Sequence, residues 1–533
     1  MDLIIRHGTV VDGTGAPGVR ADVGIAGSEI AAIGDLQHQR GTAEWDARDR
    51  IVAPGFIDMH THCDFTIFER PQADSYVLQG VTCIVVGNCG FSPAPLEPRR
   101  RDEVRQFTGL FDADLPWSWR TFDEYLSAVE RERPGVNVVS LVGLGAVRIA
   151  AIGFEKRAAA AAEIAEMARL VEDAMRAGAR GVSTGLIYPP GSFADTDEVV
   201  AVASAARAAG GFYSSHIRGE GHTLLPAIRE ALEIGRRAGL PVHVSHLKAA
   251  GRRNWGKVAD ALRLLDEART TQDVTFDQYP YTMGSTLLAA GLPQWAHDGG
   301  MGALLRRLRD GAARQRIRAE IDAGVPGWHN LVGEAGWDRV FISNNPAHPE
   351  FNGRTLAEIG RLWGRTPCDA ALDLLLDGDG AVGMVVGMMS EDDVRTVMRH
   401  PLMQVGSDGW VMGPHGRGAV ARPHPRSYGT FPRVLGPYVR DERILTLEEA
   451  VARMTSRPAR RLGLRRRGVV RVGMIADLVV FDPVRVRDTA TYADPHRFPD
   501  GITAVLVGGQ VAARDGALAP ARAGHVLRGG RAA

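Results

Sequence analysis

Apolar runs of strand length alternate with helical stretches along the middle of the chain. Residues 51–62, IVAPGFIDMHTH, begin with a β-branched apolar run, turn at Pro54-Gly55 and end on polar residues. Such alternation is typical of a parallel sheet with crossover helices. Eight segments fit the strands: Phe56–His60, Val81–Gly87, Asn137–Gly143, Gly181–Leu186, Gly211–His216, Pro241–His246, Val274–Tyr279 and Met403–Ser407.

Helices are predicted between these strands. Alanine content or apolar residues at three- and four-residue spacing mark them, and a glycine follows where a C-terminal cap would fall. Eight strands with crossover helices predict an α/β protein with a TIM-like (β/α)8 barrel at residues 55–414, whose site lies at the C-terminal strand ends. The helices are Lys156–Ala177, Asp197–Ala209, Leu224–Ala238 and Val258–Ala268, and the capping residues are Gly178, Gly210 and Gly239.

The two ends of the chain share a different pattern. Residues 1–50 and 468–515 consist of short alternating runs separated by turns such as Asp12-Gly13, which is typical of antiparallel β structure. Neither end could easily bury its apolar face alone. We therefore predict one small β-sandwich that is built from residues 1–54 and 415–533.

The stretch between the seventh and eighth strands is too long for a loop. Within it, residues 301–323 are basic and helical, and VFISNNP predicts a short strand followed by a turn. We predict an inserted α/β subdomain at residues 286–345, which could act as a lid.

Charge and composition exclude several classes of partner. The 533 residues include 63 basic and 63 acidic side chains, so no net charge favours nucleic acid or an acidic membrane. The N-terminus lacks the features of a signal peptide, and no stretch approaches roughly 18 continuous apolar residues. We expect a cytoplasmic protein with a small-molecule substrate, and a homo-oligomer is left open.

Metal-binding side chains follow several predicted strands. His60 and His62 are two residues apart, so on a strand they share one face and can bind one metal ion. An H-x-H pair alone is modest evidence, but its place at the end of the first strand strengthens it. Later strands add Cys89, His216, His246 and Asp408 at the same end of the predicted barrel.

The donor set predicts which metal would bind. Thiolate and imidazole are the donors that Zn²⁺ prefers, and a catalytic zinc site keeps one position open for water. The soft sulfur of Cys89 argues against magnesium or calcium. We therefore expect Zn²⁺ as the cofactor.

The order H-x-H, His, His and Asp, together with the split β-sandwich, resembles the amidohydrolase superfamily. Many members bridge two metals with a carbamylated lysine on the fourth strand, but GVSTGLIYPPG has no lysine. A cysteine after the second strand instead resembles the N-acyl-D-amino-acid deacylases, or D-aminoacylases. The likeness spans nearly the whole chain and includes APGFIDMHTHCD, GNCGFSPAP, GLIYPPGSFADT, SHIRGE, VSHLKAAG, FDQYPYTMGST, GSDG and HPRSYGTFPRVLG.

This resemblance implies an activity and a division of the metal ligands. The implied reaction hydrolyses an N-acyl-D-amino acid to a carboxylate and a free D-amino acid, and we expect a neutral or apolar side chain. Asp408 would take a proton from water and deliver it to the amine. The resemblance implies that Cys89, His216 and His246 hold a tightly bound zinc, and that His60, His62 and Asp408 line a second, weaker metal position.

The substrate carboxylate needs a cationic partner. Lys248 lies two residues beyond His246 and should point the same way, although a solvated lysine is the alternative. The resemblance makes Tyr281 and Ser285 carboxylate contacts, with packing as the alternative for the tyrosine.

Further residues near the strand ends have alternative roles. Arg218 and Tyr188 are additional candidates for substrate binding. Arg218 could instead pair with Glu220 behind the ligands, or Glu220 could simply stabilise the next helix. His243 is three residues from His246 and is expected to face outward. Leu144 stands where the family has a histidine, which puts the pocket shape in doubt but not the ligands.

Other functions are compatible with parts of the pattern. A cyclic-amide hydrolase such as a hydantoinase or dihydroorotase usually needs the lysine of the fourth strand, and the Cys89 motif disfavours a deaminase. A metal-binding scaffold without catalysis would be suggested by loss of the ligands or of Asp408, and all of these are present.

Overall fold

Parallel strands form the centre of the computed structural model, which describes residues 1–111, 113–416 and 418–530. In this described part the strands are β6 (Phe56–Asp58), β7 (Val81–Val86), β8 (Asn137–Ser140), β9 (Val142–Gly143), β10 (Gly181–Gly185), β11 (Phe212–His216), β12 (Val242–Val244), β13 (Val274–Gln278) and β17 (Met403–Val405). One sheet has the order β17-β13-β12-β11-β10-β9, and another has the order β6-β7-β8. Each predicted strand segment contains an observed strand, and the segment Asn137–Gly143 contains both β8 and β9.

The two parallel sheets meet at both margins. Only Leu141 separates β8 from β9. At the other margin, Thr61 pairs with Gly409 in a parallel bridge, and the Asp408 N–H donates to the His60 carbonyl at 2.7 Å. Because the strands are parallel, their C-terminal ends lie on one side of the sheets.

The predicted crossover helices are present as α6 (Ala161–Ala177), α7 (Thr196–Ala203), α8 (Leu224–Ala238) and α9 (Val258–Arg269). The first begins later than predicted, because the Glu163 side chain accepts the Ala160 N–H at 2.8 Å and caps the helix there. Gly178, Gly210 and Gly239 follow helical segments with φ of 117°, 69° and 69°. The three predicted C-terminal caps are therefore confirmed.

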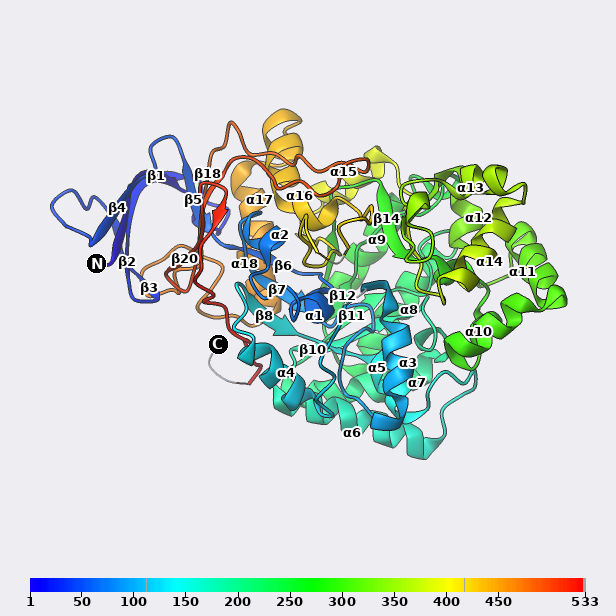
Figure 1. Ribbon diagram of the computed structural model, residues 1–533. Coiled ribbons are helices and arrows are strands. Elements are labelled where there is room, and N and C mark those ends of the chain that lie inside the picture. Colours follow the sequence, from blue (N-terminus) through cyan, green and yellow to red (C-terminus); the bar gives the residue numbers. More distant parts are fainter. Residues whose placement is uncertain (112, 417, 531–533) are drawn as a thin grey trace.

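The ends of the chain meet in one sheet of the described structure. Its strands are β1 (Leu3–Val10), β2 (Val19–Ala26), β3 (Glu29–Gly34), β4 (Ala43–Asp46), β5 (Ile51–Pro54), β18 (Leu478–Phe481), β19 (Ile502–Val507), β20 (Gln510–Arg514) and β21 (Ala517–Leu518). The order is β21-β20-β19-β18-β5-β1-β2-β3, with β4 on β1. The antiparallel pair β5–β18 joins the two ends, which lie side by side in Figure 1.

The helices before β18 belong with the parallel strands. These are α16 (Arg426–Arg433), α17 (Leu447–Met454) and α18 (Ser456–Arg461), and both α17 and α18 contact β6. Ala459 and Leu462 share a core with Ile57 and Met59. The boundary predicted at residue 415 places these helices with the terminal sheet, whereas their contacts are with the parallel strands.

The insertion is longer than the predicted residues 286–345. Strands β14 (Met283–Leu287), β15 (Val340–Asn344) and β16 (Gly383–Gly387) form an antiparallel sheet in which β16 lies between the other two. Because the central strand β16 lies far beyond residue 345, the insertion must extend at least to Gly387. Figure 1 shows helices α10 (Gly300–Arg309), α11 (Gly311–Ala323), α12 (Leu331–Ala335), α13 (Leu356–Trp363) and α14 (Pro367–Asp377) at the end of the molecule opposite the terminal sheet.

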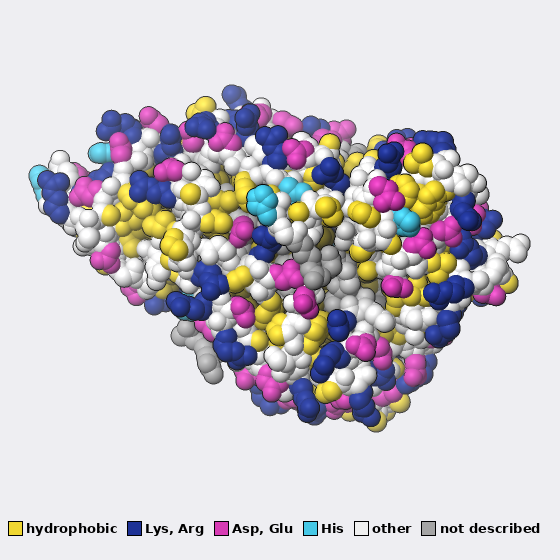
Figure 2. Space-filling model, viewed as in Figure 1, with side chains coloured by type: hydrophobic (Ala, Val, Ile, Leu, Met, Phe, Trp, Pro, Cys, Tyr) yellow, Lys and Arg dark blue, Asp and Glu magenta, His cyan; other side chains and the backbone are white. Residues whose placement is uncertain are grey.

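Charges are mixed over the face seen in Figure 2, where basic and acidic side chains are interspersed. This agrees with the balanced composition of the chain. Across residues 1–111, 113–416 and 418–530, helices that combine the length and apolar character needed to cross a membrane are absent.

Candidate metal centre and active site

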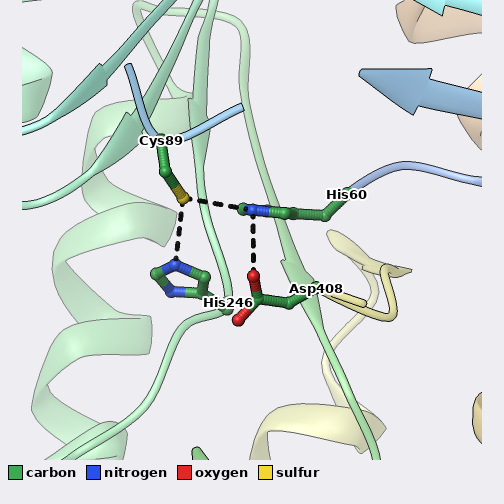
Figure 3. Close-up of side chains that lie close together, drawn as sticks. All are labelled: His60, Cys89, His246 and Asp408. Carbon is green, nitrogen blue, oxygen red and sulfur yellow. Dashed lines mark hydrogen bonds and ion pairs between the residues drawn. The ribbon is translucent and has the colours of Figure 1, made fainter. Parts of the chain in front are cut away.

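Four predicted ligands converge at the C-terminal strand ends. His60 follows β6, Cys89 follows β7, His246 follows β12 and Asp408 follows β17. One ligand atom from each lies within 4.8 Å of the others, and all four residues are buried. Figure 3 shows the four side chains pointing toward one another from different elements.

The Cys89 sulfur lies among three imidazoles. Its Sγ is 3.2 Å from His60 Nε2, 3.6 Å from His246 Nε2 and 3.8 Å from His216 Nδ1. His216 also belongs to a second buried group of possible ligands, with Glu220 and His246. The structure thus brings the predicted ligands of the tight site together.

Asp408 lies beside the H-x-H pair. Its Oδ1 is 3.1 Å from His62 Nε2 and 3.5 Å from His60 Nε2. The ligands predicted for the second metal position therefore also converge, although His62 falls outside the tightest group of four.

Three of these residues have an unfavourable backbone conformation. The φ angles of Cys89, His246 and Asp408 are 53°, 35° and 54°, in the left-handed region that non-glycine residues rarely adopt. Such strain is concentrated at functional sites, because packing must hold the side chain in one direction.

Charge stabilises the thiolate form of Cys89. Burial raises the pKa of its thiol, but the His60 imidazole and two further histidines lower it more, so this pKa lies well below its usual range. Burial lowers the pKa of His60, but the Cys89 thiolate and the Asp277 carboxylate raise it well above its usual value. A thiolate is the form of cysteine that binds metals.

Arg426 on α16 is a site residue that the sequence reasoning missed. Its Nη1 lies 2.8 Å from Asp408 Oδ2 and its Nη2 donates to the Ser285 carbonyl. Burial raises the pKa of Asp408, but Arg426 and then His62 lower it well below its usual range. Arg426 lies in the motif HPRSYGTFPRVLG, so a signal was present, but nothing in its spacing linked it to Asp408.

Lys248 lies at the site, but it already has an anionic partner. Its Nζ is 2.5 Å from Glu220 Oε1 and 2.8 Å from His246 Nδ1. Glu220 also lies 3.0 Å from His246 Nδ1. Glu220 therefore stands behind a metal ligand, whereas the suggested pairing of Glu220 with Arg218 is absent from the described contacts.

Arg218 does not reach the metal ligands. Its guanidinium pairs with Glu230 at 2.8 Å and donates to the carbonyls of Ser192 and Ala194. These bonds hold it against the neighbouring helix and loop, and its contact with substrate stays a prediction.

Of the two tyrosines after β13, Tyr279 is the one that lies beside Lys248 and Arg426. Lys248 Nζ lies 5.7 Å from its ring centroid, and the Arg426 guanidinium lies over the same ring at 4.9 Å. Tyr281 instead packs against His424, with Arg433 over its ring at 4.8 Å. Tyr279 and Tyr281 point in different directions because the strand ends at Gln278. These contacts agree with the packing alternative for Tyr281, and its contact with the substrate carboxylate stays a prediction.

The remaining candidates lie near the centre. Ser285 on β14 has a buried hydroxyl for which no partner is found among the described residues. The Tyr188 ring packs edge-on against His216 with centroids 5.0 Å apart, and its hydroxyl bonds to Thr286. Leu144 is buried at the start of a helix.

His243 is buried rather than facing outward. Its Nε2 lies 2.9 Å from Asp277 Oδ2, and the side chain is 1% exposed. The strand alternation counted back from His246 fails because β12 ends at Val244 and His246 has a left-handed backbone. Asp277, its partner, was not singled out from the sequence.

An apolar hollow adjoins the centre. Tyr188 and Phe91 border it, and their rings also contact His216 and His62. Among the described residues that line it, none carries an acidic, lysine or arginine side chain. The other principal lining residues are Phe107, Phe154, Leu287, His297 and Met301.

Comparisons with known proteins identify the class. Residues 43–513 match the amidohydrolase family, and the chain therefore belongs to that family. A D-aminoacylase from Alcaligenes xylosoxydans xylosoxydans is 37% identical over 99% of this chain and 97% of its own length. An N-acyl-D-glutamate deacylase from the same organism is 40% identical, covering 96% and 93%.

A solved structure agrees with this relationship. The N-acyl-D-glutamate deacylase from Bordetella bronchiseptica, complexed with zinc and a phosphonate inhibitor that mimics the tetrahedral intermediate, has a TM-score of 0.84. It is 37% identical, and the match covers 99% of each chain. The predicted resemblance to the N-acyl-D-amino-acid deacylases is confirmed.

Proposed function

We propose that this protein is a zinc-dependent deacylase of N-acyl-D-amino acids. The observation that carries the proposal is the convergence of the Cys89 sulfur with the imidazoles of His216 and His246 beside Asp408. The similarity to D-aminoacylase and N-acyl-D-glutamate deacylase supports the substrate class and its D configuration.

The donor geometry fits zinc. In a tetrahedral site with Zn–S of about 2.3 Å and Zn–N of about 2.0 Å, sulfur and nitrogen lie about 3.5 Å apart. The observed separations from Cys89 Sγ to His246 Nε2 and His216 Nδ1 are 3.6 and 3.8 Å. Cys89, His216 and His246 would hold the tight zinc, and His60, His62 and Asp408 would line a second position. Zinc supplies Lewis acidity and lowers the pKa of water.

Asp408 is the proposed acid–base residue. Arg426 keeps its carboxyl ionised, so Asp408 can accept the proton of the attacking water. It would then deliver that proton to the amine that leaves. The products are a carboxylate and a free D-amino acid.

Cationic groups on one side of the centre would anchor the substrate carboxylate. Lys248 and Arg426 both lie beside the Tyr279 ring, and the Ser285 hydroxyl is nearby and unpaired among the described residues. Charge-assisted bonds to a carboxylate are the strong ones. Lys248 would engage the substrate while it stays close to Glu220.

The hollow beside Tyr188 favours a neutral or apolar substrate side chain. Burial lowers the pKa of His297 to about 4, so this lining residue is neutral near pH 7. The second candidate is an acidic side chain, which the 40% identity to an N-acyl-D-glutamate deacylase favours. Relative kcat/KM on N-acetyl-D-methionine and N-acetyl-D-glutamate separates the two.

We also infer the architecture that holds the site. The two parallel sheets would act as one closed (β/α)8 barrel, the terminal sheet as a β-sandwich and the insertion as a lid. The contacts at both sheet margins and the shared core of the two chain ends support this. Cyclic-amide hydrolysis is disfavoured, because β10 carries no lysine.

The test combines metal analysis with turnover. Wild-type protein should contain zinc and hydrolyse N-acetyl-D-methionine in preference to the L enantiomer. Cys89→Ala should lose both zinc and activity, whereas Cys83→Ala, a buried cysteine in the core of the strands, should keep both. Full turnover by Cys89→Ala would contradict the proposal.

A further inference from the structure

A continuous chain of polar contacts runs from the metal centre to the opposite end of the strands. His60 Nδ1 lies 3.2 Å from Asp277 Oδ2, and His243 Nε2 lies 2.9 Å from the same oxygen. His243 Nδ1 lies 2.8 Å from Thr275 Oγ1, which accepts a hydrogen bond from Arg461 Nε at 3.0 Å.

Most of this chain of contacts is buried, Thr275 is half-buried, and the chain begins far from the site. The side chains of His60 and Asp277 are 0% exposed, that of His243 is 1% exposed and that of Arg461 is 5% exposed. Thr275 lies near the beginning of β13, whereas Asp277 lies near its C-terminal end. Arg461 is the last residue of α18, where Asp273 also pairs with it.

When His243 is neutral, only one arrangement of donors and acceptors satisfies these contacts. Arginine can only donate, so Thr275 accepts from Arg461 and its own hydroxyl hydrogen is free for His243 Nδ1. His243 then carries its proton on Nε2 and donates to Asp277. Burial lowers the pKa of His243, which favours the neutral ring.

The same logic continues to the metal centre. An ionised Asp277 only accepts, so His60 donates to it from Nδ1, and this contact turns Nε2 toward Cys89 and Asp408. Asp277 also accepts the backbone N–H of His246 at 2.9 Å through its other oxygen. The Asp277 carboxylate thus orients the ring of His60 and the backbone of His246, which are both proposed metal ligands.

We propose that Arg461, Thr275 and His243 are positioning residues that hold the Asp277 carboxylate, and through it the ring of His60, so that His60 Nε2 faces the second metal position. This inference rests on the proposed metal centre. It makes a residue of α18, at the far end of the parallel strands, a determinant of metal affinity.

The first variant removes one hydroxyl from the chain. Thr275→Val leaves His243 Nδ1 without its donor, so the His243 ring can turn and no longer holds Asp277 in one place behind His60. Partners behind a metal ligand typically change affinity about 10- to 100-fold. We expect calorimetric Zn²⁺ titration to show about tenfold weaker binding of the second equivalent, with the first equivalent changed less.

The matched control and a rescue separate positioning from packing. Thr108→Val also removes a buried hydroxyl, one that bonds only to backbone carbonyls of its own helix region, and should leave both binding steps unchanged. His243→Leu should weaken the second step. His243→Gln offers an amide donor to Asp277 and a carbonyl acceptor to Thr275, and should restore much of it.

A direct readout is the hydrogen bond from His60 to Asp277. In metal-free protein labelled with ¹⁵N-histidine, the Nδ1–H signal of His60, assigned with His60→Gln, should exchange slowly with solvent in wild type and faster in Thr275→Val. Unchanged exchange of this proton in both Thr275→Val and His243→Leu would overturn the inference, and this readout applies even if wild type binds a single zinc. Failure of wild type to bind zinc at all would instead contradict the proposed function.

Discussion

Asp408 is the residue whose chemistry can be isolated most cleanly. Asp408→Asn keeps the shape of the side chain and removes the proton acceptor, while the thiolate and imidazoles of the tight site remain. We expect kcat to fall by about 10²- to 10⁴-fold with tightly bound zinc retained. Steady-state kinetics and zinc analysis check this, with the exposed helix cap Asp310→Asn as control. Near-normal turnover would remove Asp408 from the mechanism.

Arg426 should control the pH range in which Asp408 works. It is the largest influence that lowers the pKa of this buried carboxyl, so its removal lets burial raise that pKa. In Arg426→Gln, the acid limb of the kcat/KM profile should therefore move to higher pH, because Asp408 is protonated earlier as pH falls. Arg426→Lys keeps the positive charge and should shift less. Profiles that coincide with wild type would exclude this role.

Sequence reasoning located the proposed metal ligands and fewer of their partners. His60, Cys89, His216 and His246 each follow a recognisable strand, and parallel strand ends must meet at one edge. Arg426 comes from a helix after the last parallel strand, so only the folded chain brings it to Asp408.

Strand alternation was also unreliable beyond strand ends. His243 was placed by counting positions back from His246, and the structure turns its side chain inward instead. The count fails where the backbone leaves the extended region, as it does at His246.

At the scale of elements, the helix caps allow a clean test. Gly210 has φ of 69° and open space where a Cβ would be added, so Gly210→Ala introduces backbone strain without a clash. The left-handed conformation costs about 1 kcal/mol or more for alanine, and the free energy of unfolding in urea should fall by that amount. Gly311→Ala, also in open space but at the start of α11, should be neutral or stabilising. Equal losses would contradict the cap argument.

The insertion contains a buried histidine that should make stability depend on pH. Burial lowers the pKa of His297 to about 4, below its ordinary value of 6.5, so the unfolded chain binds a proton first as pH falls. Stability should therefore decrease between pH 6.5 and 4, by about 2 kcal/mol at pH 5 relative to neutral pH. His297→Gln should reduce this decrease, and exposed His38→Gln should not. Urea unfolding at pH 7 and pH 5 measures the difference.

Element types were predicted well and element boundaries less well. Periodicity identified the parallel strands and α8 because each is bounded by a glycine or by polar residues. The predicted bounds of the insertion end too early because they leave out β16. This strand lies between β14 and β15 in the sheet, and the sequence pattern does not indicate that order.

At the scale of the whole molecule, β18 connects two cores. Leu478 and Val480 pack in the core of the terminal sheet, whereas Val479 and Phe481 pack in the main core around the parallel strands. A two-residue period places the two sets on opposite faces of the strand. The last strands of the chain therefore stabilise both the N-terminal strands and the unit that holds the active site.

This arrangement predicts that two substitutions on one strand act on different parts of the molecule. Leu478→Ala should cost about 2–5 kcal/mol and Phe481→Ala about 3–5 kcal/mol. In hydrogen exchange, Leu478→Ala should expose mainly β1 and β2. Phe481→Ala should instead expose β6, because the Phe481 ring contacts Phe56 with centroids 6.4 Å apart. Only the second should speed the thermal loss of activity, since the site is built on the parallel strands. Identical exchange patterns in the two variants would mean that the two cores unfold as one unit.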